Sequence, residues 1–240
     1  MIILGIESSA LVASAAVLNE ERLLAEFTVN NRKTHSQTLM PMIAQVMASA
    51  ETDIKDIDAI AISRGPGSFT GLRIGSATAK GLGLAIDKPL VEVPTLRAMA
   101  YGIFGTGDEL ICPIMDARRS EVYSAVFAAG LETVLEESAG PVTELIDRLN
   151  GLGRKVIFLG DGVPVYREII EEQIRTEYAF APEIMSKQRA ATVAALGLEE
   201  LKAGGGISAD EHVPVYLRVS QAEREKFGGR SNEPGQKNEA

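Results

Sequence analysis

The chain has 240 residues, of which 45% are hydrophobic and 24% charged, an ordinary composition for a soluble globular protein. Its formal net charge of −9 at pH 7 argues against strong direct binding to nucleic acid, because basic side chains that neutralise phosphates dominate such binding. No apolar run reaches the roughly 18 residues of a membrane helix, and the single cysteine excludes an internal disulfide. We therefore expect a cytoplasmic protein that binds no membrane.

The first half of the chain alternates short apolar runs with longer helical patterns. We expect three strands, a helix, a buried strand, a helix, a strand and a short helix, at residues 2–7, 13–18, 22–29, 37–50, 59–63, 70–86, 90–93 and 95–103. Asn19-Glu20 supplies the tight link of a hairpin. The run Gly105-Thr106-Gly107-Asp108 breaks the pattern and predicts a domain boundary.

The second half repeats this order in weaker form. Strands are expected at residues 110–115, 121–127, 132–137 and 156–159, and helices at 143–149, 164–175 and 189–202. Two successive β-β-β-α-β-α units predict a duplicated α/β fold of the actin, sugar-kinase and Hsp70 (ASKHA) type. The expected domains are residues 1–104 and 105–222, and residues 223–240, which have almost nothing to bury, are expected to be disordered.

A glycine-rich segment follows the buried strand at residues 59–63. Gly65-Pro66-Gly67-Ser68 forms a turn, and the helix after it contains Gly71, Gly75, Gly81 and Gly83. Each glycine costs a helix interior about 0.8–1 kcal/mol relative to alanine, which is tolerated where the backbone must approach another backbone, a ligand or a partner closely. Gly67 and Ser68 could cradle an anion at the helix start, although the Lys of a P-loop is missing. Alternatively, Ser68 or Thr70 only caps the helix.

A second candidate for anion contact is Glu7-Ser8-Ser9, at the end of the first strand. In the duplicated fold this strand end faces the interdomain cleft, where Glu7 could hold a metal-bound water and Ser8 could contact phosphate. The alternative is that a serine hydroxyl satisfies the backbone of an ordinary turn. Glu7, Ser8, Gly67 and Ser68 are thus the candidate anion or nucleotide contacts.

Other reactive side chains are sparse. The two histidines, His35 and His212, belong to distant segments, and no His-x-x-x-His or Cys-x-x-Cys pattern occurs. We therefore predict no metal site and no catalytic constellation. The charged run from Asp116 to Tyr123 joins two expected strands, where it could form a solvated salt-bridge cluster or face the cleft.

The helix at residues 37–50 is apolar most of the way round, which indicates burial on more than one side. Its apolar residues Leu39, Met42, Ile43, Val46 and Met47 could cover the sheet of their own chain or contact another subunit. The next helix offers a small-residue face. The two helices together predict a subunit interface formed by Leu39, Met42, Ile43, Val46, Met47, Gly71, Leu72, Gly75 and Ala79.

The glycine-rich segment also carries a resemblance to a known family. The motif Gly65-Pro66-Gly67-Ser68-Phe69-Thr70-Gly71-Leu72-Arg73-Ile74-Gly75 resembles the hallmark of the bacterial TsaB (YeaZ) family. Further matches are His35-Ser36-Gln37 and the segment Asp116-Ala117-Arg118-Arg119 with Glu121-Val122-Tyr123. Proteins of this family serve in the threonylcarbamoyl modification of adenosine 37 in ANN-decoding tRNAs.

The resemblance implies a non-catalytic scaffold subunit. Its partners would be a TsaD-like paralogue, which transfers the threonylcarbamoyl group, and a TsaE-like ATPase, and tRNA would be met only through this complex. The two helices described above would form the heterodimer interface, or a homodimer in isolation. No intrinsic cofactor is implied. Where the family usually has Asp-Thr-Ser, this chain has Glu7-Ser8-Ser9. This difference leaves open whether ATP or ADP binds at the subunit boundary.

Two other functions remain compatible with the residues. An autonomous ASKHA-type enzyme would bind ATP and act as an ATPase or a small-molecule kinase. A glycoprotein-directed peptidase, a description that relatives of this family have carried, is disfavoured by the lack of metal ligands in the sequence.

Overall fold

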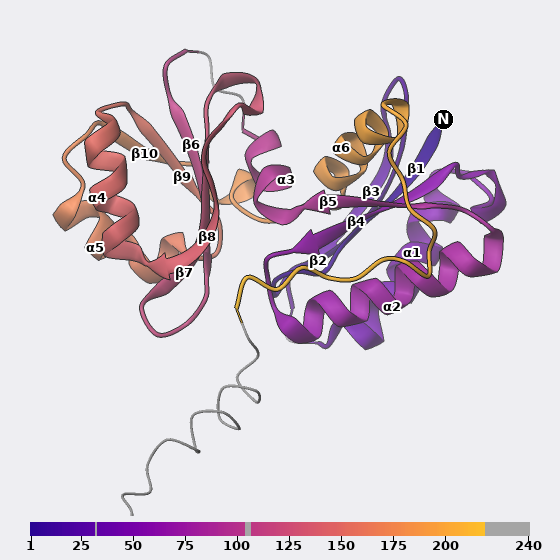
Figure 1. The fold of residues 1–240 in the computed structure, drawn as a ribbon. Helices are drawn as coiled ribbons and strands as arrows, with labels where there is room; N and C mark the ends of the chain where they lie inside the picture. Colours follow the sequence, from indigo (N-terminus) through magenta and orange to yellow (C-terminus); the bar gives the residue numbers. More distant parts are fainter. Residues whose placement is uncertain (32, 104–106, 219–240) are drawn as a thin grey trace, which may run out of the picture.

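The computed structural model describes residues 1–31, 33–103 and 107–218. They form two α/β domains side by side, each built on a five-stranded sheet (Figure 1). The first sheet has the order β3-β2-β1-β4-β5 and contains β1 (Ile2–Glu7), β2 (Ala13–Asn19), β3 (Leu23–Val29), β4 (Ala59–Gly65) and β5 (Leu90–Pro94). The second has the order β8-β7-β6-β9-β10 and contains β6 (Leu110–Asp116), β7 (Glu121–Phe127), β8 (Thr133–Pro141), β9 (Val156–Leu159) and β10 (Tyr178–Phe180).

The two sheets have the same topology. In each, the first strand pairs antiparallel with the second and parallel with the fourth, and the fifth strand lies parallel at the edge. This match confirms the predicted duplication. The Asn19-Glu20 turn is also confirmed, since the Asn19 side-chain oxygen accepts hydrogen bonds from the N–H groups of Glu21 and Arg22 at 3.0 and 2.9 Å. Strand β10 was not predicted, because its three residues are too few to establish a period.

Helices cover both faces of the first sheet. The helices are α1 (His35–Ser49), α2 (Phe69–Ile86), α3 (Thr95–Tyr101), α4 (Val142–Leu152), α5 (Val163–Gln173) and α6 (Ala190–Lys202), with 3-10 turns at Ile54–Asp56, Ala129–Leu131 and Glu183–Met185. One core joins α1 and α2 to Leu4 and Ile62 on one face of the sheet, and another joins α6 to Ile3 and Ala61 on the opposite face. Within the described ranges, no helix is both long and apolar enough to cross a membrane.

The position of α6 corrects the expected domain organisation. This helix was expected in the second domain, residues 105–222, but it packs on the first sheet (Figure 1). The contact is tight: a Cβ atom on Gly197 would lie 2.4 Å from the Cβ of Ala61, and one on Gly5 would lie 2.4 Å from the Ala190 carbonyl oxygen. The chain therefore returns to its first domain at α6. Part of the predicted Gly105–Asp108 boundary and the whole of the predicted 223–240 tail lie outside the described residues.

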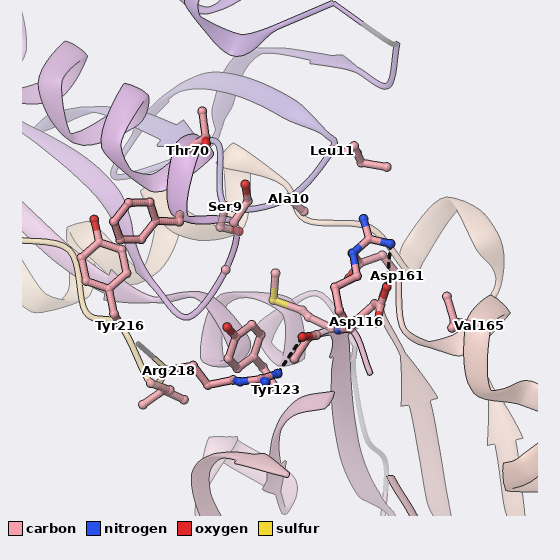
Figure 2. Close-up of a pocket in the computed structure, with 17 residues that line it drawn as sticks. Ser9, Ala10, Leu11, Thr70, Asp116, Tyr123, Asp161, Val165, Tyr216 and Arg218 are labelled. Carbon is pink, nitrogen blue, oxygen red and sulfur yellow. Dashed lines mark hydrogen bonds and ion pairs between the residues drawn. The ribbon is translucent and has the colours of Figure 1, made fainter. Parts of the chain in front are cut away.

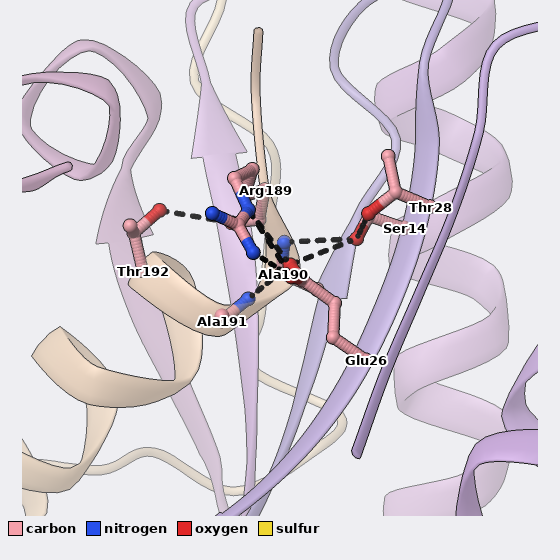
Figure 3. A network of polar contacts seen from close by, with 7 residues as sticks. All are labelled: Ser14, Glu26, Thr28, Arg189, Ala190, Ala191 and Thr192. Atoms are coloured by element: carbon pink, nitrogen blue, oxygen red, sulfur yellow. Dashed lines mark hydrogen bonds and ion pairs between the residues drawn. The ribbon is translucent and has the colours of Figure 1, made fainter. Parts of the chain in front are cut away.

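A polar network fixes the start of α6 against the first sheet (Figure 3). The Ser14 hydroxyl of β2 accepts a hydrogen bond from the Ala190 N–H at 3.1 Å, and the Glu26 carboxylate of β3 accepts one from the Ala191 N–H at 3.1 Å. Glu26 also forms an ion pair with Arg189. Since the first N–H groups of a helix have no partner within the helix, Ser14 and Glu26 act as its cap from a distant segment.

Candidate functional site

A cavity of about 530 Å³ lies between the two domains (Figure 2). The first domain contributes the turn after β1 and the start of α2, and the second contributes the end of β6 and residues near α5. The C-terminal segment after α6 supplies the remaining wall. The lining residues are Ser9, Ala10, Leu11, Gly67, Ser68, Phe69, Thr70, Met115, Asp116, Ala117, Arg118, Tyr123, Asp161, Val165, Tyr216, Leu217 and Arg218.

The start of α2 borders this cavity. The Ser68 hydroxyl accepts a hydrogen bond from the Gly71 N–H at 3.3 Å, which confirms Ser68 as the helix cap. The Ser68 N–H donates to the Ser9 carbonyl oxygen at 2.7 Å, and a Cβ atom on Gly67 would lie only 2.4 Å from that oxygen. The glycine is therefore required where two turns meet. Because Gly67 and Ser68 line the cavity, anion contact at this helix start stays a prediction for these two residues.

Glu7 and Ser8 lie beneath the cavity surface, in contrast to the sequence-based expectation. They are 1% and 0% exposed. The Glu7 carboxylate accepts a hydrogen bond from the Ser9 N–H at 2.6 Å, and the Ser8 hydroxyl donates to the Gly71 carbonyl at 3.0 Å. Both side chains thus hold the turn after β1 against its neighbours, and in this structure neither lines the cavity.

Burial raises the pKa of the Glu7 carboxyl, and the hydrogen bond from the Ser9 N–H only partly opposes this rise. An acid whose folded-state pKa is raised stabilises the fold below its unfolded-state pKa, and this stabilisation is lost as the pH rises through the folded-state value. Glu7 therefore stabilises the fold less at neutral pH than at acidic pH.

We expect Glu7→Gln to raise the melting temperature at pH 7 by about 2–4 °C, the shift that about 1 kcal/mol produces in a chain of this size. The glutamine oxygen can still accept from the Ser9 N–H. Thermal melts across the pH range measure the effect. The advantage of the variant should shrink as the pH falls toward 4.5, the ordinary pKa of the carboxyl. A variant less stable than the wild type at pH 7 would contradict this account.

The second domain presents acidic groups to the cavity. Asp116 accepts hydrogen bonds from the Tyr166 hydroxyl at 2.9 Å and from the Arg118 N–H at 2.8 Å. Burial, together with Asp116, raises the pKa of Tyr166 to about 12. Burial also raises the pKa of Asp161, and a hydrogen bond from Gln188 opposes this rise. The cavity therefore has a helix start on one side and carboxyl groups on the other.

The β6–β7 hairpin faces the cleft, the second of the two alternatives that the sequence left open. Arg118 lines the cavity, and its side chain is 84% exposed. Arg118, Arg119 and Ser120 have φ values of 66°, 58° and 61°. Such left-handed conformations are costly for residues other than glycine, so the tight hairpin imposes them against local preference.

Both histidines and the cysteine have structural surroundings. The His35 Nε2 atom lies 2.7 Å from the Ala10 carbonyl oxygen, and the His212 Nδ1 atom lies 2.6 Å from the Glu92 carboxylate. Cys112 is buried in β6, and this burial raises the pKa of its thiol. In the part of the chain that the structure describes, no three His, Cys, Asp or Glu residues are grouped so that they could share a metal ion.

The side chains predicted to contact a partner are buried inside their own domain. The set comprises Leu39, Met42, Ile43, Val46, Met47, Gly71, Leu72, Gly75 and Ala79, and all nine are buried. Their predicted exposure on a subunit surface is therefore corrected. The physical reason is that the larger apolar side chains of α1 and α2 cover the first sheet. The glycines admit the turn after β1, since a Cβ atom on Gly71 would lie 2.2 Å from the Ser8 carbonyl oxygen.

The outer faces of α1 and α2 carry small and apolar residues that the sequence analysis did not select. The two helices pack against each other, and Met40 and Leu84 are 48% and 62% exposed. We define the α1–α2 surface as the exposed residues Met40, Ala44, Ala48, Ala77, Gly81 and Leu84. These residues occupy helical positions between those that face the core, but in α1 both kinds of position are apolar, so the sequence did not separate them.

Comparisons with known proteins agree in family and fold. The family described as TsaD, tRNA N6-adenosine threonylcarbamoyltransferase, matches residues 22–226. The tRNA threonylcarbamoyladenosine biosynthesis protein TsaB of Bacillus subtilis is 32% identical over 229 residues, which cover 93% of this chain and 96% of the relative. A crystal structure of a Pseudomonas aeruginosa protein with similarity to peptidase YeaZ is 26% identical, with a TM-score of 0.78 over 90% of this chain and 99% of that one.

A more distant structure supports the fold alone. The activator of 2-hydroxyisocaproyl-CoA dehydratase from Clostridium difficile is 12% identical, with a TM-score of 0.53 over 85% of this chain and 97% of that one. Together with the duplicated sheets, this likeness agrees with the predicted ASKHA-type architecture.

Proposed function

Because the chain belongs to the TsaB family of tRNA threonylcarbamoyladenosine biosynthesis proteins, we propose that it is a cytoplasmic, non-catalytic subunit of a threonylcarbamoyltransferase complex. Its partners in this proposal are a TsaD-like paralogue, which transfers the group to adenosine 37 of ANN-decoding tRNAs, and a TsaE-like ATPase. The net charge of −9 supports contact with tRNA through the complex only.

The α1–α2 surface is the observation that carries this proposal. Met40 and Leu84 are large apolar side chains in water, and the small exposed residues Ala44, Ala77 and Gly81 leave the helix backbones accessible. Small residues of this kind let a partner helix approach closely, so that apolar side chains on both sides are covered. The same self-complementary surface would form a homodimer in the absence of the paralogue.

We expect Ala77→Arg to weaken binding of the TsaD-like paralogue by at least about tenfold, which corresponds to 1.4 kcal/mol. The substitution places a charged side chain in the centre of the proposed contact but meets only solvent in the isolated chain, because Ala77 is exposed. Binding is measured by titration calorimetry, and activity by threonylcarbamoyl transfer in a reconstituted system that contains tRNA, the paralogue and the TsaE-like ATPase.

Gln173→Arg is the matched control, because it adds the same charge at an exposed position on α5. It should bind the paralogue and support transfer as the wild type does. Wild-type binding and transfer by Ala77→Arg, measured at limiting subunit concentration, would overturn the proposed interface.

A nucleotide is the candidate cofactor for this cavity. Gly67 and Ser68 at the start of α2, with the guanidinium groups of Arg118 and Arg218, could hold a phosphate group, whereas Asp116 and Asp161 would repel one. We propose that the isolated chain has no cofactor of its own and that any ATP or ADP lies at the subunit boundary. The competing function is an autonomous ATPase or small-molecule kinase. Calorimetry of the isolated chain with ATP and Mg²⁺ discriminates between them, since micromolar binding with turnover would favour the enzyme.

A further inference from the structure

After α6 the chain runs back along the first domain toward the cleft (Figure 1). We call residues 207–218 the strap. At its beginning, Ile207 and Leu90 of β5 exchange backbone hydrogen bonds of 2.8 and 2.9 Å. Along its middle, the Lys80 ammonium of α2 donates to the carbonyl oxygens of Asp210 and His212 at 2.9 and 3.0 Å. The strap is therefore fixed to both the edge strand and α2.

The strap then reaches the first turn of α2. The Val215 N–H donates to the Arg64 carbonyl oxygen at 2.7 Å. The Tyr216 ring lies 4.7 Å from the Phe69 ring between centroids, and the Arg73 guanidinium lies 3.8 Å from the Phe69 centroid. Arg73 also donates to the Tyr216 hydroxyl at 3.3 Å. These contacts fix the strap at the mouth of the cleft.

At Arg218 the strap crosses to the second domain. The Arg218 guanidinium donates to the Ala117 carbonyl oxygen at 2.7 Å (Figure 2). It also lies 2.5 Å from the Glu121 carboxylate, with the two side chains 12% and 32% exposed. Both partners belong to the β6–β7 hairpin. An ion pair of this kind, half removed from water and reinforced by a second hydrogen bond, is stronger than a typical surface pair.

A second cross-cleft interaction lies nearby. Burial raises the pKa of Glu137 in β8, and the positive charge of Arg64 in β4 opposes this rise. Arg64 is also the residue whose carbonyl binds the strap. The charges of Arg64 and Glu137, one from each domain, therefore interact.

A further connection between the domains is apolar. Leu96 and Met99 of α3 share a core with Ile111, Met115 and Leu159 of the second domain. In Figure 1, α3 and the crossing end of the strap lie at different levels of the gap between the two sheets. Beside this apolar contact, the Arg97 guanidinium of α3 donates to the Leu131 carbonyl oxygen of the second domain at 3.1 Å. The strap adds a polar tether at a different level, and such a tether limits rotation about the contacts at α3.

We propose that the strap is a latch, in which Arg218 bound to Glu121 and the Ala117 carbonyl holds the two domains at a fixed opening. Tyr216, Leu217 and Arg218 also form one wall of the interdomain cavity. Release of the latch would therefore open that wall and free the domains to move apart. This inference is independent of the proposed subunit function, because it concerns the isolated chain.

The latch can be tested by spin-label distance measurements on the full-length chain. Labels on Lys55→Cys and Arg148→Cys report one exposed position in each domain, and the native Cys112 is buried and will not react. We expect a narrow distance distribution for the chain with native Arg218. Arg218→Ala should give a broader distribution with a longer mean distance, and Glu121→Gln should shift it in the same direction.

Arg167→Ala is the matched control, because it removes an arginine whose ion pair with Glu171 lies within α5. It should leave the distribution unchanged. The charge exchange Arg218→Glu with Glu121→Arg should narrow the distribution again relative to Arg218→Ala. If Arg218→Ala and Glu121→Gln both keep the distance distribution of the labelled chain with native Arg218, the proposed latch is overturned. If Arg218→Ala does not fold, the distance distribution of Glu121→Gln decides whether the latch holds the domains.

Discussion

Gly71→Ala is expected to lower the free energy of unfolding by about 3 kcal/mol, the upper end of the usual cost of overpacking. The added Cβ atom would lie 2.2 Å from the Ser8 carbonyl oxygen. This neighbour is backbone and cannot rotate away, because Ser8 directly follows the central strand β1 and its hydroxyl is bonded to the Gly71 carbonyl. Urea denaturation measures the change, with the same dependence of the unfolding free energy on urea concentration (m-value) used for both proteins.

Gly81→Ala in the same helix is the matched control. Apart from the adjoining residues and the backbone of its own helix, no atom lies within 4 Å of the Cβ position of Gly81. The substitution should therefore stabilise the chain by about 0.8–1 kcal/mol through helix propensity alone. Gly75→Ala should fall between the two, because its clash is with the Ser8 hydroxyl, which can change rotamer. Equal effects at 71 and 81 would contradict a role of Gly71 in packing within the chain.

Because Gly71 and Gly75 are packed inside the domain and Gly81 is not, only substitutions at exposed positions of α2 can test binding to a partner. A bulky residue at Gly75 would abolish tRNA modification through damage to the first domain, since its Cβ atom would lie 2.1 Å from the Ser8 hydroxyl oxygen. The result would carry no information about an interface. Ala77 and Gly81 are exposed on the same helix, and substitutions there leave the interior unchanged.

The order of strands and helices could be predicted because each apolar run ends at a clear turn. Strands β1, β7 and β9 occupy the expected residues, and the duplicated topology follows from that order. The face of α1 could not be predicted in the same way. Between Leu39 and Ala48 every residue except Gln45 is apolar. The hydrophobic period therefore does not distinguish Val46, which is buried, from Ala44 and Met40, which are exposed.

The candidate site was predictable only where it is local in sequence. Gly67 and Ser68 were identified because a turn and a helix start are adjacent along the chain. Tyr216 and Arg218 were not identified, since they reach the cavity through contacts with Phe69 and Glu121, roughly 100–150 residues away. The docking of α6 on the first sheet depends on the small side chains Gly5 and Ala61, whose significance appears only when the strands are side by side.

Glu26→Ala is expected to lower the free energy of unfolding by about 2 kcal/mol, because it leaves the Ala191 N–H at a buried helix start without its acceptor. The lost ion pair contributes less than a buried pair would, since the Arg189 side chain is 39% exposed and water can solvate it. Glu26→Gln keeps an acceptor oxygen for the Ala191 N–H but loses the charge, so its effect should be smaller.

Glu20→Ala serves as the control for this prediction. Glu20 also pairs with a residue of α6, Lys202, but both side chains are about half exposed, and such pairs are worth about 0–1 kcal/mol. Amide hydrogen exchange distinguishes the two variants further. Glu26→Ala should accelerate exchange along α6 from Ala190 onward, because the helix loses its cap, whereas Glu20→Ala should not. If amide exchange in α6 is the same in Glu26→Ala as in the wild type, packing on Gly5 and Ala61 holds the helix. The polar network at the start of α6 would then contribute nothing to the stability of the helix.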